Sequence, residues 1–562
     1  MTYTEEVVAQ RDDLKNGEMK QVLVGETDVL LVRQDNRFYA LHAFCSHYGA
    51  ALVNGALSDG RIICPWHHAC FDATSGDQIE PPGLDSLDAY HVELEGQDIV
   101  VRVPDAPGGH RIADLAHRSD IDTRTFIVLG GGAAGEYAVE ALRRCGFLGR
   151  VVMITKEAET PYDRPNCSKE YLMGEAPEEW MFLRSPDFYD EYDIERMHET
   201  TVSEVDAASR TLTLEDGRRI PFDGIVLCTG GIPNAPDIPG ADLEGVYTLR
   251  SMVDSREIME AGRSSLSAVV VGASFIGMEV AYSLKELGVE EVTVIGPEKV
   301  PFAKPFGERV GMMVKDIHEE NEVRFRLGHT VKEFQGTGLV ERVLLDDGST
   351  IEADLVVVGI GVHPATDFIN GLEKADDGSI IVDETLQAAP GIYAAGDIAT
   401  FPDWRTGGQI RVEHWRLACQ HGRLAGTNLA RHAAGAEAES AAGTTSDTAT
   451  SDTAASGTAA ESGTGAAAKP YRSIPYFWTV HFGTSIRYVG HIESWDEIIY
   501  HGSPEERKFI AFYVKGDDVL AASGTNCDTE MSAIEELMRR ERMPTVIDLK
   551  RGEVDYVARL ND

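Results

Sequence analysis

The chain has 562 residues, 43% of them hydrophobic, which is too long for one hydrophobic core, so about three or four domains are expected. Its formal net charge is −42, from 93 acidic and 51 basic residues, and this charge argues against binding to nucleic acid or to anionic membrane surfaces. No apolar run approaches the ~20 residues that a membrane-spanning helix needs.

Residues 1–105 are predicted to form a small β domain, because short segments of alternating polar and apolar residues are separated by Gly and Pro turns. Two segments of this domain carry the patterns C-x-H and C-x-x-H. In a Rieske [2Fe–2S] cluster, two thiolates bind one iron and two imidazoles bind the other. The predicted cluster ligands are therefore Cys45, His47, Cys64 and His67.

A structural zinc site is the alternative interpretation of two Cys and two His. Zinc-finger patterns usually place two Cys in one half of the site and two His in the other. Here each half of the site mixes the two residue types, and this mixture favours the Rieske cluster.

After a predicted linker at residues 106–122, residues 123–247 are predicted to begin an α/β domain with a strand, a Gly-rich turn and a helix. In the G-x-G-x-x-G pattern the first Gly allows a tight turn, the second lets the backbone approach a pyrophosphate, and the third lets the helix pack on the strand. Glu157, at the end of the next predicted strand, is a candidate for binding the adenosine ribose. The residues of the turn predicted to bind the cofactor are Gly130, Gly132, Ala134 and Gly135.

A second nucleotide-binding turn is predicted within residues 248–365. Ser stands in place of its middle glycine. This side chain is small enough to let a pyrophosphate approach the backbone. Glu298, the candidate acid for binding the adenosine ribose, lies two residues after the end of the next strand. Only Lys299 stands nearby to bind the 2′-phosphate of NADPH. We therefore expect NADH, although NADPH stays open. The residues of this turn are Gly272, Ser274 and Gly277.

Gly396 and Asp397 follow an apolar strand in residues 366–432. With two nucleotide-binding turns before it, this pair resembles the one in two-dinucleotide flavoproteins, in which the Asp binds the ribityl chain of FAD. The resemblance implies two Rossmann-like domains, with an FAD domain that is split by an NAD(P)H domain.

Residues 433–469 form a low-complexity segment of mostly small and polar residues. Such a segment buries too little apolar surface to offset the entropy lost on ordering, so it is predicted to be a disordered linker. In residues 470–562, apolar strand-like segments and a predicted helix at about 530–542 indicate a small α+β domain.

Three further segments narrow the resemblance. PYDRPNCSKEYL, which ends at Leu172, matches the P-Y-x-R-P-x-x-S-K-x-x-L signature of the ferredoxin reductase and apoptosis-inducing-factor-like family. The family implies that Arg164 contacts an FAD phosphate. It also implies that Lys169 lies near the flavin ring, where it steadies the negative charge of the reduced flavin. The segments EHW and IPYFW match the flavin-edge motifs of the family at Glu413, His414, Trp415 and Trp478.

With its N-terminal cluster motif, the chain resembles the apoptosis-inducing-factor-like flavoproteins that carry a Rieske domain. The resemblance implies an enzyme that passes electrons from NADH through FAD to its own cluster and on to an external acceptor, such as a redox protein or an oxygenase. Lys169 would be its catalytic residue. The C-terminal domain would resemble the dimerisation-like domain of the reductases, and a homodimer is compatible with this.

Two other functions stay open at this point. One is a terminal reductase of a small molecule such as nitrite or a quinone, although no residues indicate a haem or a second metal site. The other is a sensor of NADH or redox state without enzymatic turnover.

The composition also bears on the environment of the protein. Its basic residues are mostly Arg, and an acidic surface with few Lys is typical of a high-salt cytoplasm. An ordinary acidic protein is the alternative. Because the first residues lack the basic start and apolar centre of a signal peptide, we expect a cytoplasmic protein.

Overall fold

The computed structural model describes residues 2–442, 467–552 and 554–561. Its chain divides into two compact units. The first comprises Met1–Ala113, Lys304–Val314 and Ser473–Asp562, and the second comprises Asp114–Ala303 and Lys315–Arg472. Among the described residues, no helix is both long and apolar enough to cross a bilayer.

The N-terminal part of the first unit is an antiparallel β domain, as the alternating sequence pattern predicted. The order of its larger sheet is β1-β11-β10-β4-β3-β2, and that of its smaller sheet is β5-β6-β7-β8. The first predicted cluster loop precedes β5, and the second joins β6 to β7. The strands are β1 (Tyr3–Gln10), β2 (Glu18–Val24), β3 (Thr27–Gln34), β4 (Arg37–His42), β5 (Ala56–Ser58), β6 (Arg61–Ile63), β7 (Cys70–Asp72), β8 (Gln78–Glu80), β10 (Ala89–Glu95) and β11 (Asp98–Pro104).

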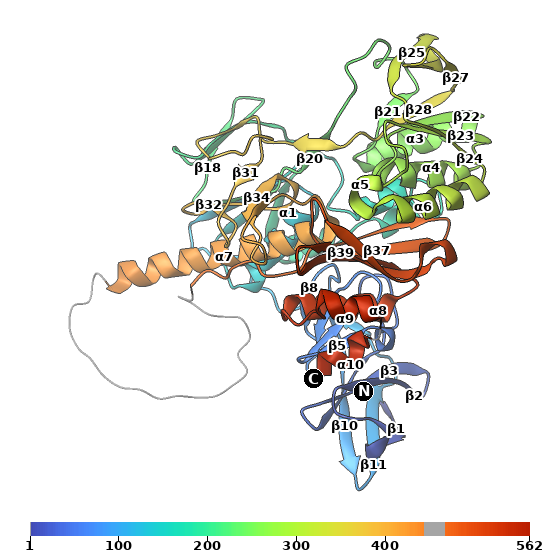
Figure 1. Ribbon diagram of the computed structural model, residues 1–562. Helices are drawn as coiled ribbons and strands as arrows, with labels where there is room; N and C mark the ends of the chain where they lie inside the picture. Colours follow the sequence, from blue (N-terminus) through green and yellow to red (C-terminus); the bar gives the residue numbers. More distant parts are fainter. Residues whose placement is uncertain (1, 443–466, 553, 562) are drawn as a thin grey trace. The chain divides into compact units, whose positions relative to one another are not determined.

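The C-terminal part of the same unit is an α+β domain, again as predicted. Its antiparallel sheet has the order β36-β37-β40-β39-β38. Helix α8 packs on β37 and β40 and also contacts β5 of the N-terminal domain (Figure 1). The elements are β36 (Tyr476–His481), β37 (Thr484–Gly490), β38 (Glu497–Ser503), β39 (Lys508–Lys515), β40 (Asp518–Thr525), α8 (Asp528–Arg539), α9 (Val546–Arg551) and α10 (Tyr556–Asn561).

The second unit contains the two α/β domains. The order of the first sheet is β15-β14-β13-β19-β33-β32, with β32 as an antiparallel edge. Strands from two separate parts of the chain build this sheet, as expected of a split domain. Its elements are β13 (Thr125–Leu129), α1 (Ala133–Arg144), β14 (Arg150–Ile154), β15 (Ile194–Met197), β19 (Gly224–Leu227), β32 (Gln387–Ala389) and β33 (Ile392–Ala394).

The second α/β domain is inserted into the first. Its parallel sheet has the order β21-β28-β22-β23-β24. Both Gly-rich turns lie at the carboxyl ends of parallel strands, after β13 and β22, where ligands of open α/β sheets bind. The elements are β21 (Val246–Thr248), β22 (Ser267–Val271), α4 (Phe275–Leu287), β23 (Glu291–Gly296), β24 (Val323–Leu327) and β28 (Leu355–Val358).

Helix α7 (Trp415–Ala442) continues past the expected start of the linker at residue 433. Its last residues are mainly Ala and Glu, which are strong helix formers, so the helix does not need a buried face to persist there. Residues 443–466 of the predicted linker lie outside the described residues.

Candidate functional site

The four predicted cluster ligands come together as a pair of imidazoles and a pair of thiols. The Nδ1 atoms of His47 and His67 are 3.0 Å apart. Cys45 and Cys64 are each 1% exposed, and their thiols share a hydrogen bond. Each loop supplies one residue to each pair, as the mixed sequence pattern predicted.

The protonation states of these residues fit an iron–sulfur cluster. Burial lowers the pKa of His47 to about 3, so its ring is neutral and can bind a metal. Burial also raises the pKa of the Cys45 thiol well above its usual range, and metal binding would have to displace that proton. Two thiolates and two neutral imidazoles are the donor set of a Rieske cluster.

The spacing of the ligand atoms disfavours a single zinc ion. Within the described ranges, only His329, Asp346 and Asp347 bring three candidate ligand atoms within 4.8 Å of one another. A tetrahedral zinc ion would need its four ligand atoms closer together than this, because each lies only about 2.0–2.3 Å from the metal. The Cys pair and the His pair are therefore better suited to two iron atoms.

Aromatic rings surround the imidazole pair. The ring centroid of Trp478, on β36, is 4.1 Å from that of His67 and 6.4 Å from that of His47. The ring of Tyr48 lies 4.2 Å from that of His47 and 5.4 Å from that of His67. The resemblance assigned Trp478 to the flavin edge, and the structure places it against a predicted cluster ligand.

The first Gly-rich turn has the geometry of a phosphate cradle. A Cβ on Gly130 would lie 2.1 Å from the carbonyl oxygen of Cys228, and a Cβ on Gly135 would lie 1.9 Å from that of Gly130. Neither position can hold a larger residue. Beside Gly132, at the N-terminus of α1, the space within 4 Å of such a Cβ is open, which leaves room for a pyrophosphate at the helix N-terminus.

Glu157 and Arg164, which the sequence assigned to different parts of FAD, form one ion pair. Arg164 donates to Oε1 of Glu157 at 2.8 Å, and the hydroxyl of Tyr162 donates to Oε2 at 2.5 Å. Burial would raise the pKa of Glu157, but Arg164 and Tyr162 outweigh it and hold that pKa below its usual value. The carboxylate is thus ionised, as a ribose-binding acid should be.

The Gly396-Asp397 turn lies beside the first helix turn of α1. A Cβ on Gly396 would sit 3.4 Å from that of Ala134, so these predicted FAD residues are neighbours. Asp397 forms an ion pair with Arg250 at 2.7 Å. Sequence patterns gave no signal for Arg250, because it belongs to no motif and reaches Asp397 only through the tertiary fold.

Arg411 links the EHW segment to the same turn. It donates to the carbonyl oxygen of Asp397 at 3.1 Å and pairs with Glu413. Burial raises the pKa of Glu413. The segment ends where helix α7 begins at Trp415, after His414.

Lys169 forms a buried ion pair that sequence reasoning missed. Its Nζ lies 2.6 Å from Oε2 of Glu279, on helix α4, and the two residues are 7% and 4% exposed. Ser168 donates to the same carboxylate oxygen at 2.6 Å. Glu279 therefore brings a negative charge from the second α/β domain to the lysine of the PYDRPNCSKEYL segment.

The second Gly-rich turn is equally tight. A Cβ on Gly272 would lie 2.2 Å from the carbonyl oxygen of Gly359, and one on Gly277 would lie 2.0 Å from that of Gly272. Ser274 holds the position before the first residue of α4 in extended backbone conformation, and its side chain makes no capping hydrogen bond.

Although it lies two residues past β23, Glu298 reaches back to the end of that strand. Its Oε2 would lie 2.6 Å from a Cβ on Gly296. This oxygen is buried and has no hydrogen-bond partner among the described residues. An unsatisfied buried carboxylate oxygen is costly, so this position fits a missing donor such as a ribose hydroxyl.

Three family models match the chain. Residues 124–422 match the pyridine nucleotide-disulphide oxidoreductase family, residues 4–91 match the Rieske [2Fe-2S] domain, and residues 476–555 match the reductase C-terminal domain.

Individual proteins match over most of their length. Apoptosis-inducing factor 3 from Homo sapiens is 34% identical, over 98% of this chain and 88% of that protein. The ferredoxin–NAD(+) reductase component of a biphenyl dioxygenase system from Paraburkholderia xenovorans is 30% identical, over 74% of this chain and 93% of that one. Among solved structures, the ferredoxin reductase for the CYP199A2 system from Rhodopseudomonas palustris has a TM-score of 0.66 and 27% identity, and covers 77% of this chain and 100% of its own.

Proposed function

The chain belongs to the pyridine nucleotide-disulphide oxidoreductase family, and we propose that it passes electrons from NADH through FAD to its own Rieske cluster and then to an external acceptor. It is an NAD(P)H-dependent flavin oxidoreductase whose cofactors are FAD, NAD(P)H and a Rieske [2Fe–2S] cluster. FAD accepts a hydride, equivalent to two electrons, from the reduced nicotinamide, and the cluster takes one electron at a time.

The contact between Trp478 and His67 carries this proposal. Trp478 belongs to the segment that resembles a flavin-edge motif, and its ring lies 4.1 Å from the ring of a predicted cluster ligand. The resemblance implies that this residue lies at the flavin edge, so we propose that one aromatic side chain serves both cofactors. Such an arrangement supports electron transfer within the chain, without a separate ferredoxin between the two cofactors.

An anaerobic titration with NADH, followed by electron paramagnetic resonance, tests the proposal. The cluster should become reduced with no added ferredoxin. Because FAD takes two electrons and the cluster one, full reduction should need about 1.5 NADH per chain. A cluster that stays oxidised while the flavin bleaches would show that electrons leave the flavin directly for an external acceptor.

We assign the two nucleotide sites residue by residue. The contacts and open spaces described above support FAD at the first turn and NADH at the second. The proposed FAD residues are Gly130, Gly132, Ala134, Gly135, Glu157, Arg164, Lys169, Gly396, Asp397, Glu413, His414, Trp415 and Trp478, and the proposed NADH residues are Gly272, Ser274, Gly277 and Glu298.

The proposed acceptor is a redox protein or an oxygenase. One relative is named as the ferredoxin reductase component of a dioxygenase system, which supports an acceptor of this class. The proposal also places the enzyme in the cytoplasm. A homodimer stays a prediction, which the molar mass measured in solution will check.

Replacing Lys169 with Ala should slow flavin reduction by NADH by about 10- to 100-fold and lower the flavin potential. The buried ammonium would no longer stabilise the negative charge that develops on the flavin. Anaerobic stopped-flow measurement of flavin bleaching and a potentiometric titration would measure both effects.

Glu279→Gln is the matched control, because it keeps the shape of the partner but removes its charge. Without the negative charge of Glu279, the positive charge of Lys169 should act more strongly on the flavin. The flavin potential should therefore rise, opposite to the effect of Lys169→Ala. If Lys169→Ala reduces its flavin at the wild-type rate with an unchanged potential, the lysine serves only as the structural partner of Glu279.

Replacing Glu298 with Ala should raise the KM for NADH by about 10- to 100-fold with little change in kcat. Hydrogen bonds to a charged group contribute about 1.5–3 kcal/mol. The adenosine ribose lies far from the reacting nicotinamide, so the chemical step should be little affected. The wild-type protein should also prefer NADH to NADPH, because the carboxylate repels a 2′-phosphate. Steady-state kinetics with both nucleotides will check this, and an unaltered KM would remove Glu298 from the site.

A further inference from the structure

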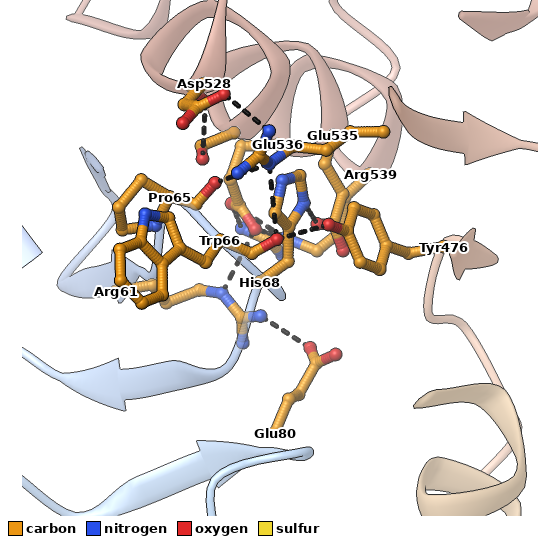
Figure 2. A network of polar contacts seen from close by, with 12 residues as sticks. Arg61, Pro65, Trp66, His68, Glu80, Tyr476, Asp528, Glu535, Glu536 and Arg539 are labelled. Carbon is orange, nitrogen blue, oxygen red and sulfur yellow. Dashed lines mark hydrogen bonds and ion pairs between the residues drawn. The ribbon is translucent and has the colours of Figure 1, made fainter. Parts of the chain in front are cut away.

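Side chains of the C-terminal domain form hydrogen bonds with the backbone of the second cluster loop. Arg487 of β37 donates from Nε to the carbonyl oxygens of Pro65, at 3.0 Å, and Trp66, at 3.3 Å. The hydroxyl of Tyr476 also donates to the Trp66 carbonyl (Figure 2). Arg487 is 7% exposed and Tyr476 is fully buried. Because both carbonyls lie between the two ligands of this loop, the C-terminal domain fixes the segment that joins them.

The next residue of the loop, His68, makes a second buried contact. Its backbone has a φ of 56°, in the left-handed region that few residues with a side chain adopt. Its Nδ1 bonds the carboxylate of Glu535, on α8, and its ring stacks on that of Tyr476 at 4.1 Å. Glu535 is 4% exposed. A carboxylate buried to this degree needs partners, and His68 supplies one of them from the cluster loop.

Helix α8 makes further contacts with the Rieske domain. Glu536, which is 1% exposed, pairs with Arg61 of β6 at 3.4 Å and with Arg539 of its own helix at 2.6 Å. Near the start of the helix, the hydroxyl of Thr529 donates to the carbonyl oxygen of Asn54 at 2.6 Å. The helix thus contacts several segments of the Rieske domain, and Figure 2 shows the centre of this set of contacts.

We propose that these contacts hold the Rieske domain permanently on the C-terminal domain, so that the cluster is a fixed relay and not a mobile carrier. The two domains form one compact unit. Glu535 and Arg487 are positioning residues for the electron step, and this role rests on the proposed internal transfer. We call the contacts the α8 network, which comprises Arg61, Pro65, Trp66, His68, Tyr476, Arg487, Glu535 and Glu536.

A fixed relay behaves differently from a docked ferredoxin. Weak complexes between redox proteins bury small interfaces, and exposed charge pairs that guide them are screened at high ionic strength. The charged side chains of the α8 network are mostly buried, and buried pairs are screened much less. The attachment of the Rieske domain to the C-terminal domain should therefore be insensitive both to salt and to protein concentration.

The wild-type holoprotein gives the first test, by hydrogen–deuterium exchange. Backbone amides of residues 61–72 and of helix α8 should exchange slowly and be protected to the same degree as each other, both in 0.1 M and in 2 M KCl. The rate of cluster reduction after flavin reduction should change by less than about twofold over that range. Fast, separate exchange of the two segments would overturn the proposal. So would a rate of cluster reduction that falls at least tenfold with salt.

Variants of Glu535 give the second test. Glu535→Ala removes the carboxylate that bonds to His68, so the exchange of residues 61–72 should accelerate at least about tenfold, which corresponds to about 1.4 kcal/mol. Cluster reduction should slow by a similar factor, while flavin reduction by NADH stays within about twofold. Glu535→Gln keeps a hydrogen-bonding oxygen and should restore both values. Glu530→Ala, on the same helix but outside the network, is the matched control.

The outcomes separate this proposal from the proposed function. If NADH never reduces the cluster of the wild-type protein, the internal transfer is wrong, and the exchange data alone then decide whether the domain is fixed. If NADH reduces the cluster but Glu535→Ala matches Glu530→Ala in both exchange and transfer rate, the α8 network does not position the cluster. Should Glu535→Ala fail to fold, the wild-type exchange and salt data decide.

Discussion

Replacing His67 with Ala is expected to remove the [2Fe–2S] cluster and to leave FAD bound and reducible by NADH. One iron of a Rieske cluster is held by two imidazoles, and His67 is one of the two whose Nδ1 atoms lie 3.0 Å apart. The ligand lies in the first compact unit, whereas both Gly-rich turns lie in the second. Iron, acid-labile sulfide and FAD per chain, together with stopped-flow flavin bleaching, measure the two halves of this expectation.

His91→Ala makes a suitable control, because it is the same substitution in the same domain at a side chain that is 56% exposed. It should keep the full iron content. With His67→Ala, delivery of electrons to a one-electron acceptor protein should fall to the background level. A His67→Ala protein that keeps its iron would exclude His67 as a ligand, and one that folds but cannot reduce its flavin would show that the two units do not work separately.

The parts of the molecule that were predicted correctly depend on local patterns. The strands and helices around both Gly-rich turns follow from short segments, such as the one from β13 to α1, in which sequence and geometry are tightly linked. The cluster ligands come from two motifs of three and four residues, and their assignment stays a prediction. In these regions a single sequence carries enough information.

The parts that were missed depend on contacts between distant segments. Glu279 meets Lys169 across 110 residues, and His68 meets Glu535 across 467 residues. Neither glutamate stands out in its own helix, because a carboxylate on a helix is usually solvated. Only the packing of α4 against one segment and of α8 against another buries them. One sequence without tertiary contacts gives no means to distinguish them from surface acids.

The free energy of unfolding is expected to rise strongly with salt. Even if every one of the 51 basic residues paired with an acid, 93 − 51 = 42 acidic residues would have no cationic partner. Their mutual repulsion destabilises the compact state. The Debye length falls from about 10 Å at 0.1 M to about 3 Å at 1 M, so salt should screen this repulsion. We expect the Tm to rise by at least about 5 °C between 0.1 M and 2 M KCl.

Thermal unfolding followed by flavin fluorescence and circular dichroism measures this shift. KCl is the appropriate salt, because sulfate would also strengthen the burial of apolar groups, and an uncharged osmolyte at equal osmolarity controls for exclusion from the surface. Dialysis into dilute buffer should release FAD slowly. A protein that stays fully flavinated with the same Tm in low salt would mean that its acidic surface serves solubility or the choice of partner.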